Sequence, residues 1–444
     1  MNKTTRKSLF QLFIPIFAES MLMLLVGSVD TLMVSKVSDT AAGAIGASNS
    51  FIALFIISFN IISSGVMAVM TQFIGAEKEC VAVKALKIGL FINAILGLLL
   101  SVVLFIFASD FVHLMNVPIK QVDDALVYTR IIGATLFLNS ITPIISSYLR
   151  AFGHTALPMY SSIASNIINA IFNAIWIFGL FGAPILGVKG VALATVISKV
   201  CNLLVNLIFA LIIVKPKKDD YQISYGNVLK KIIKIGLPAA LETTLYNIAM
   251  AMVSRMINGM DEEGINNTAR SYAQTITHFS YVTAMSLAQA NSIMVGWAIG
   301  EKRQEDAYKF TLKRWKYGTL LCIGVASLVA LFSRYIIGLF TNNADILKLC
   351  QMILVIDIAL ELGRATNLIL GIALKNSGDA LYTVIIAIIF MFVCGVGVSY
   401  LFGVKLEYMV AGCYIGLALD EIVRGFFMLL RWRSKKWMAK SLIK

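Results

Sequence analysis

The chain has 444 residues, of which 59% are hydrophobic and only 14% are charged, and it carries a net charge of +14. A water-soluble domain would have about 25% charged residues, so this composition excludes an ordinary soluble protein and predicts one that lies in a lipid bilayer. The positive charge does not predict a nucleic acid partner, because the basic residues flank apolar segments, as the positive-inside rule expects of a membrane protein.

Twelve apolar segments follow one another along the chain, each long enough to cross a bilayer as a helix. If the N-terminus lies inside the cell, most of the Lys and Arg residues in loops fall on the cytoplasmic side, whereas the acidic residues divide almost evenly. The even number of spans then returns the C-terminus to the cytoplasm. The predicted spans lie near residues 9–34, 46–74, 85–108, 126–149, 156–180, 186–214, 229–258, 271–299, 316–340, 349–373, 379–403 and 408–432.

Within the first span, the stretch FAESMLMLLVGSVDTLMV is almost wholly apolar but contains two acids, Glu19 and Asp30. They lie about three helical turns apart and therefore project from one face of the helix. Acids inside a membrane usually face a cavity or a partner, where they take part in ion or proton transfer. Both are candidates for binding a cation, and the alternative is a hydrogen bond inside the helix bundle. Pro15, one turn before Glu19, is expected to kink this helix.

The fifth span has one polar face, because its polar side chains recur every three or four residues. These side chains are Ser162, Asn166, Asn169 and Asn173. Hydrogen bonds between helices are one explanation for such a stripe. The other is that Asn169 and Asn173 face Asp30 and tune its affinity for a cation.

The two halves of the chain are similar to each other. FIPIFAES in span one and GLPAALET in span seven both place a proline four residues before a glutamate, so Glu19 corresponds to Glu242. QFIGAEK matches WAIGEKR, and LRAFGHTALP matches LKNSGDALY, which aligns Arg150 with Lys375. The three matches have offsets of 223, 225 and 225 residues. Matches at nearly one offset indicate an internal duplication.

The longest polar connection, KPKKDDYQISYGN, separates the two halves. We therefore predict an all-α integral membrane protein with twelve helices in two pseudo-symmetric lobes of six. The N-terminal lobe covers residues 1–214, a cytoplasmic linker covers 215–228, and the C-terminal lobe covers 229–444 and ends in a short basic tail. Repeats with an even number of spans start on the same side of the membrane, and transporters built in this way bind substrate between their lobes.

The tenth span, LVIDIALELGRATNLIL, contains Asp357, Glu361 and Arg364. Glu361 and Arg364 are three residues apart and are expected to pair within the helix, with a cation-coupling or substrate site at Glu361 as the alternative. Asp357 has no such partner on its own helix and has the clearer claim to a cavity. Asp420 and Arg424 in span twelve are expected to form a structural pair of the same kind.

Further candidates for a cation or substrate site in the second half are Glu242 of span seven and two residues on one face of span eight, Gln274 and His278. A single histidine in a span is more often a packing residue than a proton carrier. Methionines such as Met250 are adaptable enough to line a cavity for varied ligands. Packing between helices remains the alternative for each of these residues.

No motif of an enzyme is present. The sequence has no HExxH, no nucleophile elbow and no GxxxxGK[ST] loop, and its three His and six Cys are scattered. We therefore expect neither catalysis nor a cofactor.

The motifs together resemble the multidrug and toxic compound extrusion (MATE) family. PIFAESMLMLLVGSVDTLMV is similar to the first span of that family, with its proline, glutamate and aspartate. The stretch from LRAFGHTALP to GVKGVALAT is similar to the region from span four into span six. ELGRATNLILGIALKNSGDA and LALDEIVRGFFMLLRWRSKKW are similar to span ten and to the C-terminus. The resemblance covers essentially the whole chain.

This resemblance implies a V-shaped exporter of a bacterial inner or plasma membrane, which exchanges inward H⁺ or Na⁺ for organic, often cationic and amphipathic compounds. In the bacterial proton- or sodium-linked branch of the family the first-span aspartate is the cation site, and the resemblance therefore implies H⁺ or Na⁺ binding at Asp30. A kink at the first-span proline, here Pro15, is associated with coupling. The family's Asn and Asp of span five fall on Asn169 and Asn173, so this chain has Asn in place of the acid. The acids of another branch, in spans seven and ten, have approximate counterparts in Glu242 and Asp357.

We therefore predict a monomeric secondary antiporter that exports small organic compounds through the lipid bilayer. A flippase for a lipid-linked precursor, from the same superfamily, is the alternative, and it would favour a wider and more basic cavity. A membrane-embedded enzyme and a channel belong to other classes. Accumulation of substrate against a gradient would distinguish a pump from a channel.

Overall fold

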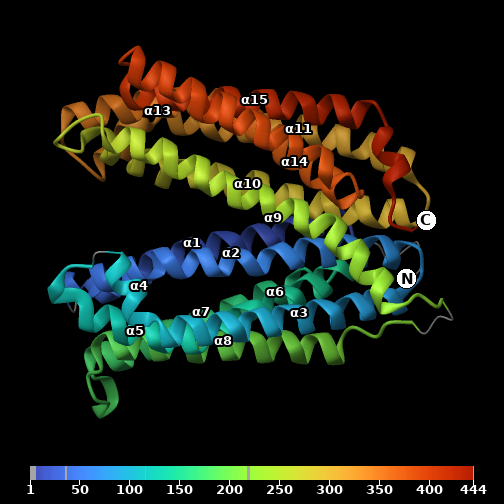
Figure 1. Ribbon diagram of the computed structural model, residues 1–444, viewed down its shortest axis with the longest axis horizontal. Helices are drawn as coiled ribbons and strands as arrows, with labels where there is room; N and C mark the ends of the chain where they lie inside the picture. Colours follow the sequence, from blue (N-terminus) through green and yellow to red (C-terminus); the bar gives the residue numbers. More distant parts are fainter. Residues whose placement is uncertain (1–6, 36–37, 116, 218–220, 444) are drawn as a thin grey trace. The chain divides into compact units, whose positions relative to one another are not determined.

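The computed structural model describes residues 7–35, 38–115, 117–217 and 221–443, apart from the side chains of residues 24–32, 35, 39, 50, 54, 57, 58, 60 and 61. The regular secondary structure of this described part is all helical, with no strand (Figure 1). The helices that precede residue 220 are α1 (Leu9–Ser35), α2 (Asp39–Gly75), α3 (Glu79–Ile106), α4 (Ala108–Leu114), α5 (Val122–Ala134), α6 (Leu136–Ala151), α7 (Ala156–Phe178) and α8 (Gly187–Ile212).

The helices of the second half are α9 (Tyr225–Asn258), α10 (Ile265–Gly300), α11 (Gln304–Leu331), α12 (Ser333–Gly338), α13 (Ala344–Asn376), α14 (Ala380–Phe390) and α15 (Met409–Arg433). After α14 the chain continues as a π-helix over Met391–Val398 and Tyr400–Lys405. Short 3₁₀ turns lie at Ile119–Gln121, Leu180–Gly182 and Lys436–Lys440. Each of the twelve predicted spans falls on one helix or on consecutive helical segments.

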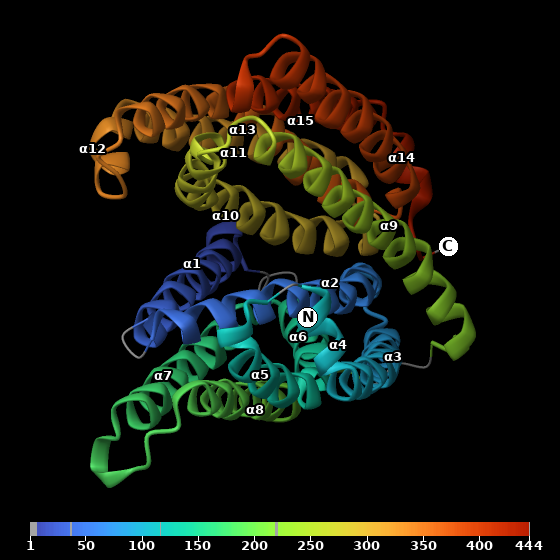
Figure 2. The ribbon, with the colours of Figure 1, turned by 60° about the vertical axis from the view of Figure 1, so that its left-hand side comes forward.

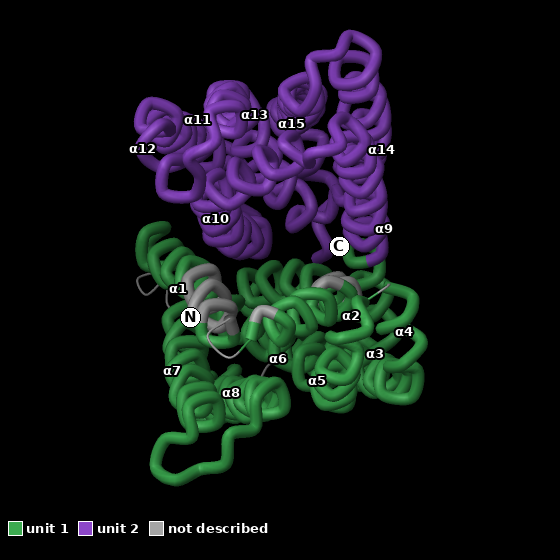
Figure 3. The backbone as a smooth tube through the Cα atoms, turned by 90° about the vertical axis from the view of Figure 1, so that its left-hand side faces the viewer, with its two compact units in different colours: residues 1–236 green, residues 237–444 purple. Residues whose placement is uncertain are grey.

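The chain folds as two compact units, residues 1–236 and 237–444 (Figure 3). In the first unit α7 packs against α8 and α1, and α3 packs against α2 and α6. In the second unit α13 is central, because α10, α11 and α15 all pack against it (Figure 2). The all-α fold expected from the apolar periodicity is confirmed.

Five of the described helices are individually long and apolar enough to cross a bilayer, or six if the pair Ile119–Ala134 and Leu136–Ala151, bent by 45°, counts as one span. The five are α3, α7, α8, α10 and the continuous segment Ala380–Lys405. Large apolar side chains on the outside of the units, such as Phe91 and Leu211, are 68% and 72% exposed. Such side chains are suited to contact with lipid rather than water.

The two units repeat the same local geometry, which confirms the internal duplication. The helix break at Phe107, between α3 and α4, recurs 225 residues later at Phe332, between α11 and α12. The turn after α6 has Gly153 at φ +84°, and the turn after α13 has Gly378 at φ +98°. A backbone in this left-handed region favours glycine at both places.

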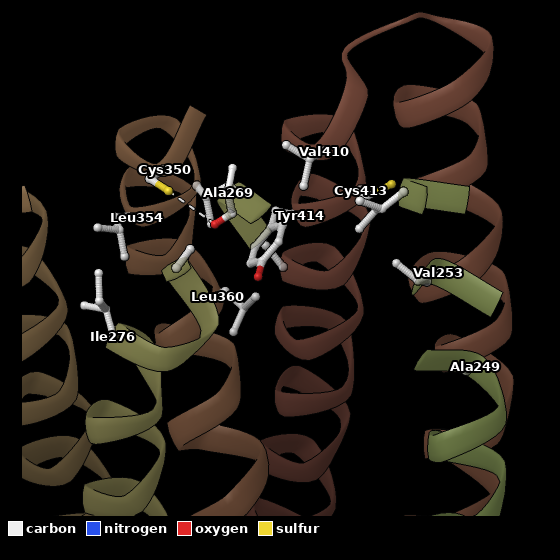
Figure 4. Packing of buried hydrophobic residues seen from close by; sticks show 14 of the residues in the cluster. Ala249, Val253, Ala269, Ile276, Cys350, Leu354, Leu360, Val410, Cys413 and Tyr414 are labelled. Carbon is white, nitrogen blue, oxygen red and sulfur yellow. Dashed lines mark hydrogen bonds between the residues drawn. The ribbon is translucent and has the colours of Figure 1, made fainter. Parts of the chain in front are cut away.

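The largest apolar core of the second unit joins α9, α10, α13 and α15 (Figure 4). It contains Val253, Ala269, Leu354, Val410 and other buried residues. Small residues inside it let the helices approach closely, and the Cys350 thiol donates to the carbonyl oxygen of Ala269 at 3.2 Å. This packing fixes the central helix on which several candidate residues lie.

Candidate functional site

Glu19 forms an ion pair with Arg150 across two helices of the first unit. Glu19 is 7% exposed, and Arg150, in the last turn of α6, donates to its Oε2 at 2.7 Å. Ser162 of α7 donates to Oε1 at 3.2 Å. The Glu19 carboxylate is therefore engaged by a guanidinium group and by the first residue of the predicted polar stripe. The sequence did not predict this partner, although the repeat singled out both residues.

The turn between α6 and α7 holds α1 at a second point. Pro15 lies inside α1 and has no N–H, so the carbonyl group of Gln11, four residues earlier, lacks its helical donor. The buried hydroxyl of Thr155 donates to this carbonyl oxygen at 3.3 Å. The segment that begins with Arg150 at the end of α6 therefore also supplies the donor for the carbonyl group that Pro15 leaves without one.

The asparagines of the predicted stripe lie on α7, which packs against α1 and α8. Asn169 and Asn173 are 5% and 0% exposed, and Asn173 Nδ2 donates to Asn169 Oδ1 at 3.1 Å. The predicted neighbour of these two residues, Asp30, belongs to α1, but its side chain lies outside the described residues. Its predicted role in binding H⁺ or Na⁺ stays a prediction.

The second unit contains the equivalent of the first ion pair. Glu242, four residues after Pro238 in α9, accepts a hydrogen bond from Lys375 Nζ at 2.8 Å. Lys375 lies in the last turn of α13. The duplication aligned glutamate with glutamate and arginine with lysine. The structure brings each pair together at the corresponding place, so the cation differs between the units but the contact is retained.

A second group of charges lies on α13. Glu361 is fully buried and accepts a hydrogen bond from Arg364 Nη1, which is the pair expected within the helix. Asp357, one turn earlier, is 2% exposed. Two carboxyl groups and one guanidinium group are thus held on a single helix inside the second unit.

The charges of α15 adjoin those of α13. Arg424 is 4% exposed and its Nη2 lies 2.6 Å from Asp420 Oδ2 and 2.8 Å from Glu421 Oε1. Asn367 of α13 donates to Glu421 Oε2 at 3.0 Å, which joins the two helices. The sequence predicted the pair between Asp420 and Arg424, but not the second carboxylate or the bond to α13.

Two glycines explain why these helices lie so close. A Cβ atom on Gly363 would lie 2.4 Å from the backbone carbon of Glu421 and from the backbone nitrogen of Ile422. A Cβ atom on Gly425 would lie 2.9 Å from the carbonyl oxygen of Gly363. Backbones approach to this distance only where side chains are absent. The glycine inside the ELGRAT motif therefore sets the distance between the two charged groups.

Three carboxylate oxygens of this cluster have no hydrogen-bond partner within the part of the chain that the structure describes. They are Asp357 Oδ1, Glu361 Oε2 and Asp420 Oδ1. An unpartnered buried carboxylate oxygen is costly. The cluster also holds four carboxyl groups but two guanidinium groups, because Glu361, Asp420 and Glu421 pair with Arg364 or Arg424 and Asp357 lies one turn before Glu361. This imbalance favours a bound proton or another cation.

The cluster adjoins a cavity of about 80 Å³ in the second unit. This volume holds several water molecules but is smaller than the roughly 300–1,000 Å³ of a typical ligand pocket. Glu361 is linked to the cavity through its partner Arg364. The lining residues are Tyr246, Met250, Arg270, Gln274, Thr277, Leu360, Arg364, Tyr414, Leu417, Asp420 and Glu421.

Of the two candidate residues on span eight, one lines this cavity and the other is not among its lining residues. Gln274 belongs to its lining, as does Met250 of α9. His278, one turn beyond Gln274, is exposed, and its ring lies 5.4 Å from the ring of Tyr281. In the described ranges no group of three or more His, Cys, Asp or Glu is arranged to hold a metal ion.

A family model described as MatE matches the chain twice, over residues 15–175 and 238–401. The chain belongs to the MATE transporter family. The two matches begin at the prolines of α1 and α9, so they follow the internal duplication. Membership places this protein among multi-pass membrane transporters rather than among enzymes.

Related proteins align with almost the whole length of this chain. The uncharacterized transporter YisQ of Bacillus subtilis is 34% identical over 442 residues, which is 98% of this chain and 96% of that protein. The probable multidrug resistance protein NorM of B. subtilis is 26% identical, over 98% of this chain and 97% of its own. NorM of Thermotoga maritima, also named a probable multidrug resistance protein, is 24% identical, with 99% and 94% covered. These names do not favour the flippase alternative.

Solved structures show the same fold. An outward-facing multidrug resistance MATE transporter of the MOP superfamily matches with a TM-score of 0.85 at 21% identity, covering 96% of this chain and 95% of its own. A MATE structure in the bent conformation gives 0.86 at 22% identity, with 96% and 94% covered. A MOP superfamily transporter from Pyrococcus furiosus, described as having a binding pocket of reversed polarity, gives 0.85 at 21% identity, with 98% and 96% covered.

Proposed function

We propose that this MATE transporter is a secondary antiporter that exports small organic compounds in exchange for inward H⁺ or Na⁺. The observation that carries the proposal is the set of buried carboxylate oxygens without hydrogen-bond partners, on Asp357, Glu361 and Asp420. Such groups in membrane helices usually mark ion and proton pathways. The multidrug resistance relatives support an organic substrate, and the excess of carboxylates in the cluster supports a cationic one.

Coupling requires that the cation and the substrate bind differently to two states of the protein. When a cation neutralises Asp357, the repulsion between that carboxylate and Glu361 ends, and the packing of α13 against α15 can change. When the cation leaves, the site regains negative charge and attracts a cationic substrate. We assign the first-unit cation site to Asp30, with Asn169 and Asn173 as its neighbours. We include Glu19 and Glu242 in the same cycle, because each forms an ion pair at the corresponding place of its unit.

The test is dye efflux in proteoliposomes under a pH gradient alone or a Na⁺ gradient alone. The proposal expects one gradient to drive accumulation of a cationic fluorescent dye, and expects Asp30→Asn to abolish it. Asp357→Asn should shift the pH dependence of dye accumulation, and this substitution leaves no guanidinium group unpaired. Glu263→Gln, an exposed site in the loop between α9 and α10, is the matched control. Gradient-driven efflux at the wild-type rate in Asp30→Asn would remove that residue from the coupling site. Efflux insensitive to both gradients would overturn the antiport proposal.

We further propose that the protein acts as a monomer in the bacterial plasma membrane, with both termini in the cytoplasm. The distribution of Lys and Arg among the loops supports the orientation of the termini. Reporter fusions after Lys444 that are active only in the cytoplasm test the orientation, and light scattering in detergent tests the oligomeric state. Activity of a periplasmic reporter at the same position would contradict the orientation.

A further inference from the structure

The chain does not leave the second unit at the end of α15 but folds back over it. Trp437, four residues beyond Arg433, is fully buried, and its ring stacks on Trp432 with centroids 4.1 Å apart. The indole Nε1 of Trp437 donates to the carbonyl oxygen of Trp432 at 3.0 Å. The basic tail that follows α15 is thus part of the folded second unit.

Trp437 packs where four helices of the second unit end. Its apolar cluster contains Ala298 near the end of α10, Ala307 near the start of α11, Leu374 near the end of α13 and Met428 near the end of α15. An aromatic side chain buried in this way stabilises its surroundings through its large contact area. We call residues 434–443 the C-terminal strap.

The strap also covers the turn that follows α13. The carbonyl oxygen of Lys440 lies 2.3 Å from the position that a Cβ atom on Gly378 would occupy. Leu442, two residues further on, is 2% exposed. Asp379, which follows Gly378 in the turn, accepts a hydrogen bond from Arg431 Nε at 2.7 Å. The turn is therefore held by the end of α15 and by the strap.

Lys375, the basic residue of the second-unit ion pair, lies where this turn begins. Gly378 N donates to the carbonyl oxygen of Lys375 at 3.0 Å, and Asp379 N donates to that of Leu374 at 3.0 Å. Lys375 in turn pairs with Glu242 of α9. A continuous set of contacts thus leads from Trp437, through the turn, to a carboxylate on the helix that begins the second repeat.

We propose that the C-terminal strap positions Lys375 against Glu242, with Trp437 as its anchor, and so sets how readily α9 moves during transport. This inference rests on the proposed function only for its effect on transport, because the contacts belong to the second unit alone. Trp437 is a positioning residue, since it acts through Lys375 and touches neither the cation cluster nor the cavity lining.

The first unit provides an internal control. Its equivalent turn has the same two hydrogen bonds, from Gly153 N to Arg150 O and from His154 N to Leu149 O, both at 2.9 Å. Within the residues that the structure describes, that turn is tied to α1 by the bond from Thr155 to Gln11 O. A change in the strap should therefore loosen one turn and leave its counterpart unaffected.

Hydrogen exchange of the full-length protein in detergent tests the positioning directly. In Trp437→Ala, amides of residues 375–379 should exchange at least about tenfold faster, because local opening becomes easier when a buried aromatic group is removed. Amides of residues 150–154 should keep their rates. Trp437→Phe should restore most of the protection. A chain that ends at Met438 keeps the stacked tryptophans but loses the Lys440 contact, and should show the same change. Unchanged exchange at 375–379 in both variants would overturn the proposal.

Transport in a double-mutant cycle separates positioning from general damage. Trp437→Ala should change the efflux rate in the wild-type background and have no further effect in Glu242→Gln, because the pair through which it acts is already absent. In Glu19→Gln, which removes the pair of the other unit, the effect of Trp437→Ala should remain in full. Equal effects in both backgrounds would overturn the proposal. Efflux that depends on neither ion gradient would refute the antiport function instead. The hydrogen-exchange measurement would still test the strap.

Discussion

Gly363→Ala tests the conclusion that a glycine sets the distance between the two charged helices. The new Cβ atom would lie 2.4 Å from backbone atoms of Glu421 and Ile422, whereas ordinary contacts begin at 3.4 Å. The difference is about 1 Å, and neither neighbour is a flexible side chain. The backbone of α15 must therefore move away from α13 by about 1 Å.

The size of the effect follows from two opposing contributions. Overpacking of this kind costs about 1–3 kcal/mol, whereas replacing glycine by alanine within a helix stabilises by up to about 1 kcal/mol. Gly324→Ala in α11 is the matched control, because a Cβ atom there meets nothing within 4 Å. The control gains the helical contribution without the clash. Gly363→Ala should therefore be less stable than Gly324→Ala by about 1–3 kcal/mol.

Thermal unfolding of the two variants in the same detergent measures this difference. For a unit of about 200 residues, 1 kcal/mol corresponds to about 2–4 °C, so the two Tm values should differ by roughly 2–12 °C. Dye efflux should also fall in Gly363→Ala, because the bond between Asn367 and Glu421 spans the shifted interface. Equal Tm values, with wild-type efflux in both variants, would refute the conclusion that close backbone approach holds this cluster together.

Three smaller predictions concern the loops and turns. Thr155→Val should destabilise the protein by about 1–3 kcal/mol in thermal unfolding, because it removes the donor to Gln11 O, and Thr155→Ser should recover most of that loss. Burial and the charge of Lys7 lower the pKa of His154 below 6.5, so the unfolded chain takes up this proton at higher pH than the folded protein. The wild type should accordingly lose stability as pH falls below about 6.5, and His154→Gln should lose less; parallel pH profiles of Tm would contradict this. Asp261 accepts hydrogen bonds from the first backbone N–H groups of α10, so Asp261→Ala should cost about 1 kcal/mol of stability while Asp261→Asn costs less, and equal Tm values for all three chains would exclude the cap.

Contacts within one helix were predictable from the sequence because helical periodicity fixes them. Glu361 and Arg364 are three residues apart, and they pair as expected. Asp420 and Arg424 are four residues apart, and they pair as well. The twelve helical spans follow from the same kind of local information, since a chain in lipid must satisfy its backbone hydrogen bonds within each segment.

Contacts between helices were not predictable in this way. Glu19 and Arg150 are 131 residues apart, and Glu242 and Lys375 are 133 residues apart. The duplication aligned the members of these pairs but did not show that they meet. Nor did the sequence show that Glu421 joins the cluster, although it lies beside Asp420 in the chain.

The sequence by itself determined that this protein is helical, crosses a membrane and consists of two repeats, because apolar length, helical periodicity and a constant offset are properties of the chain read in order. Only the tertiary structure decided which charges face one another. That outcome depends on the approach of α13 to α15 at Gly363 and on turns that bring Arg150 and Lys375 back to the first helix of each repeat. Periodicity fixes the face on which a side chain lies, but packing decides what that face meets.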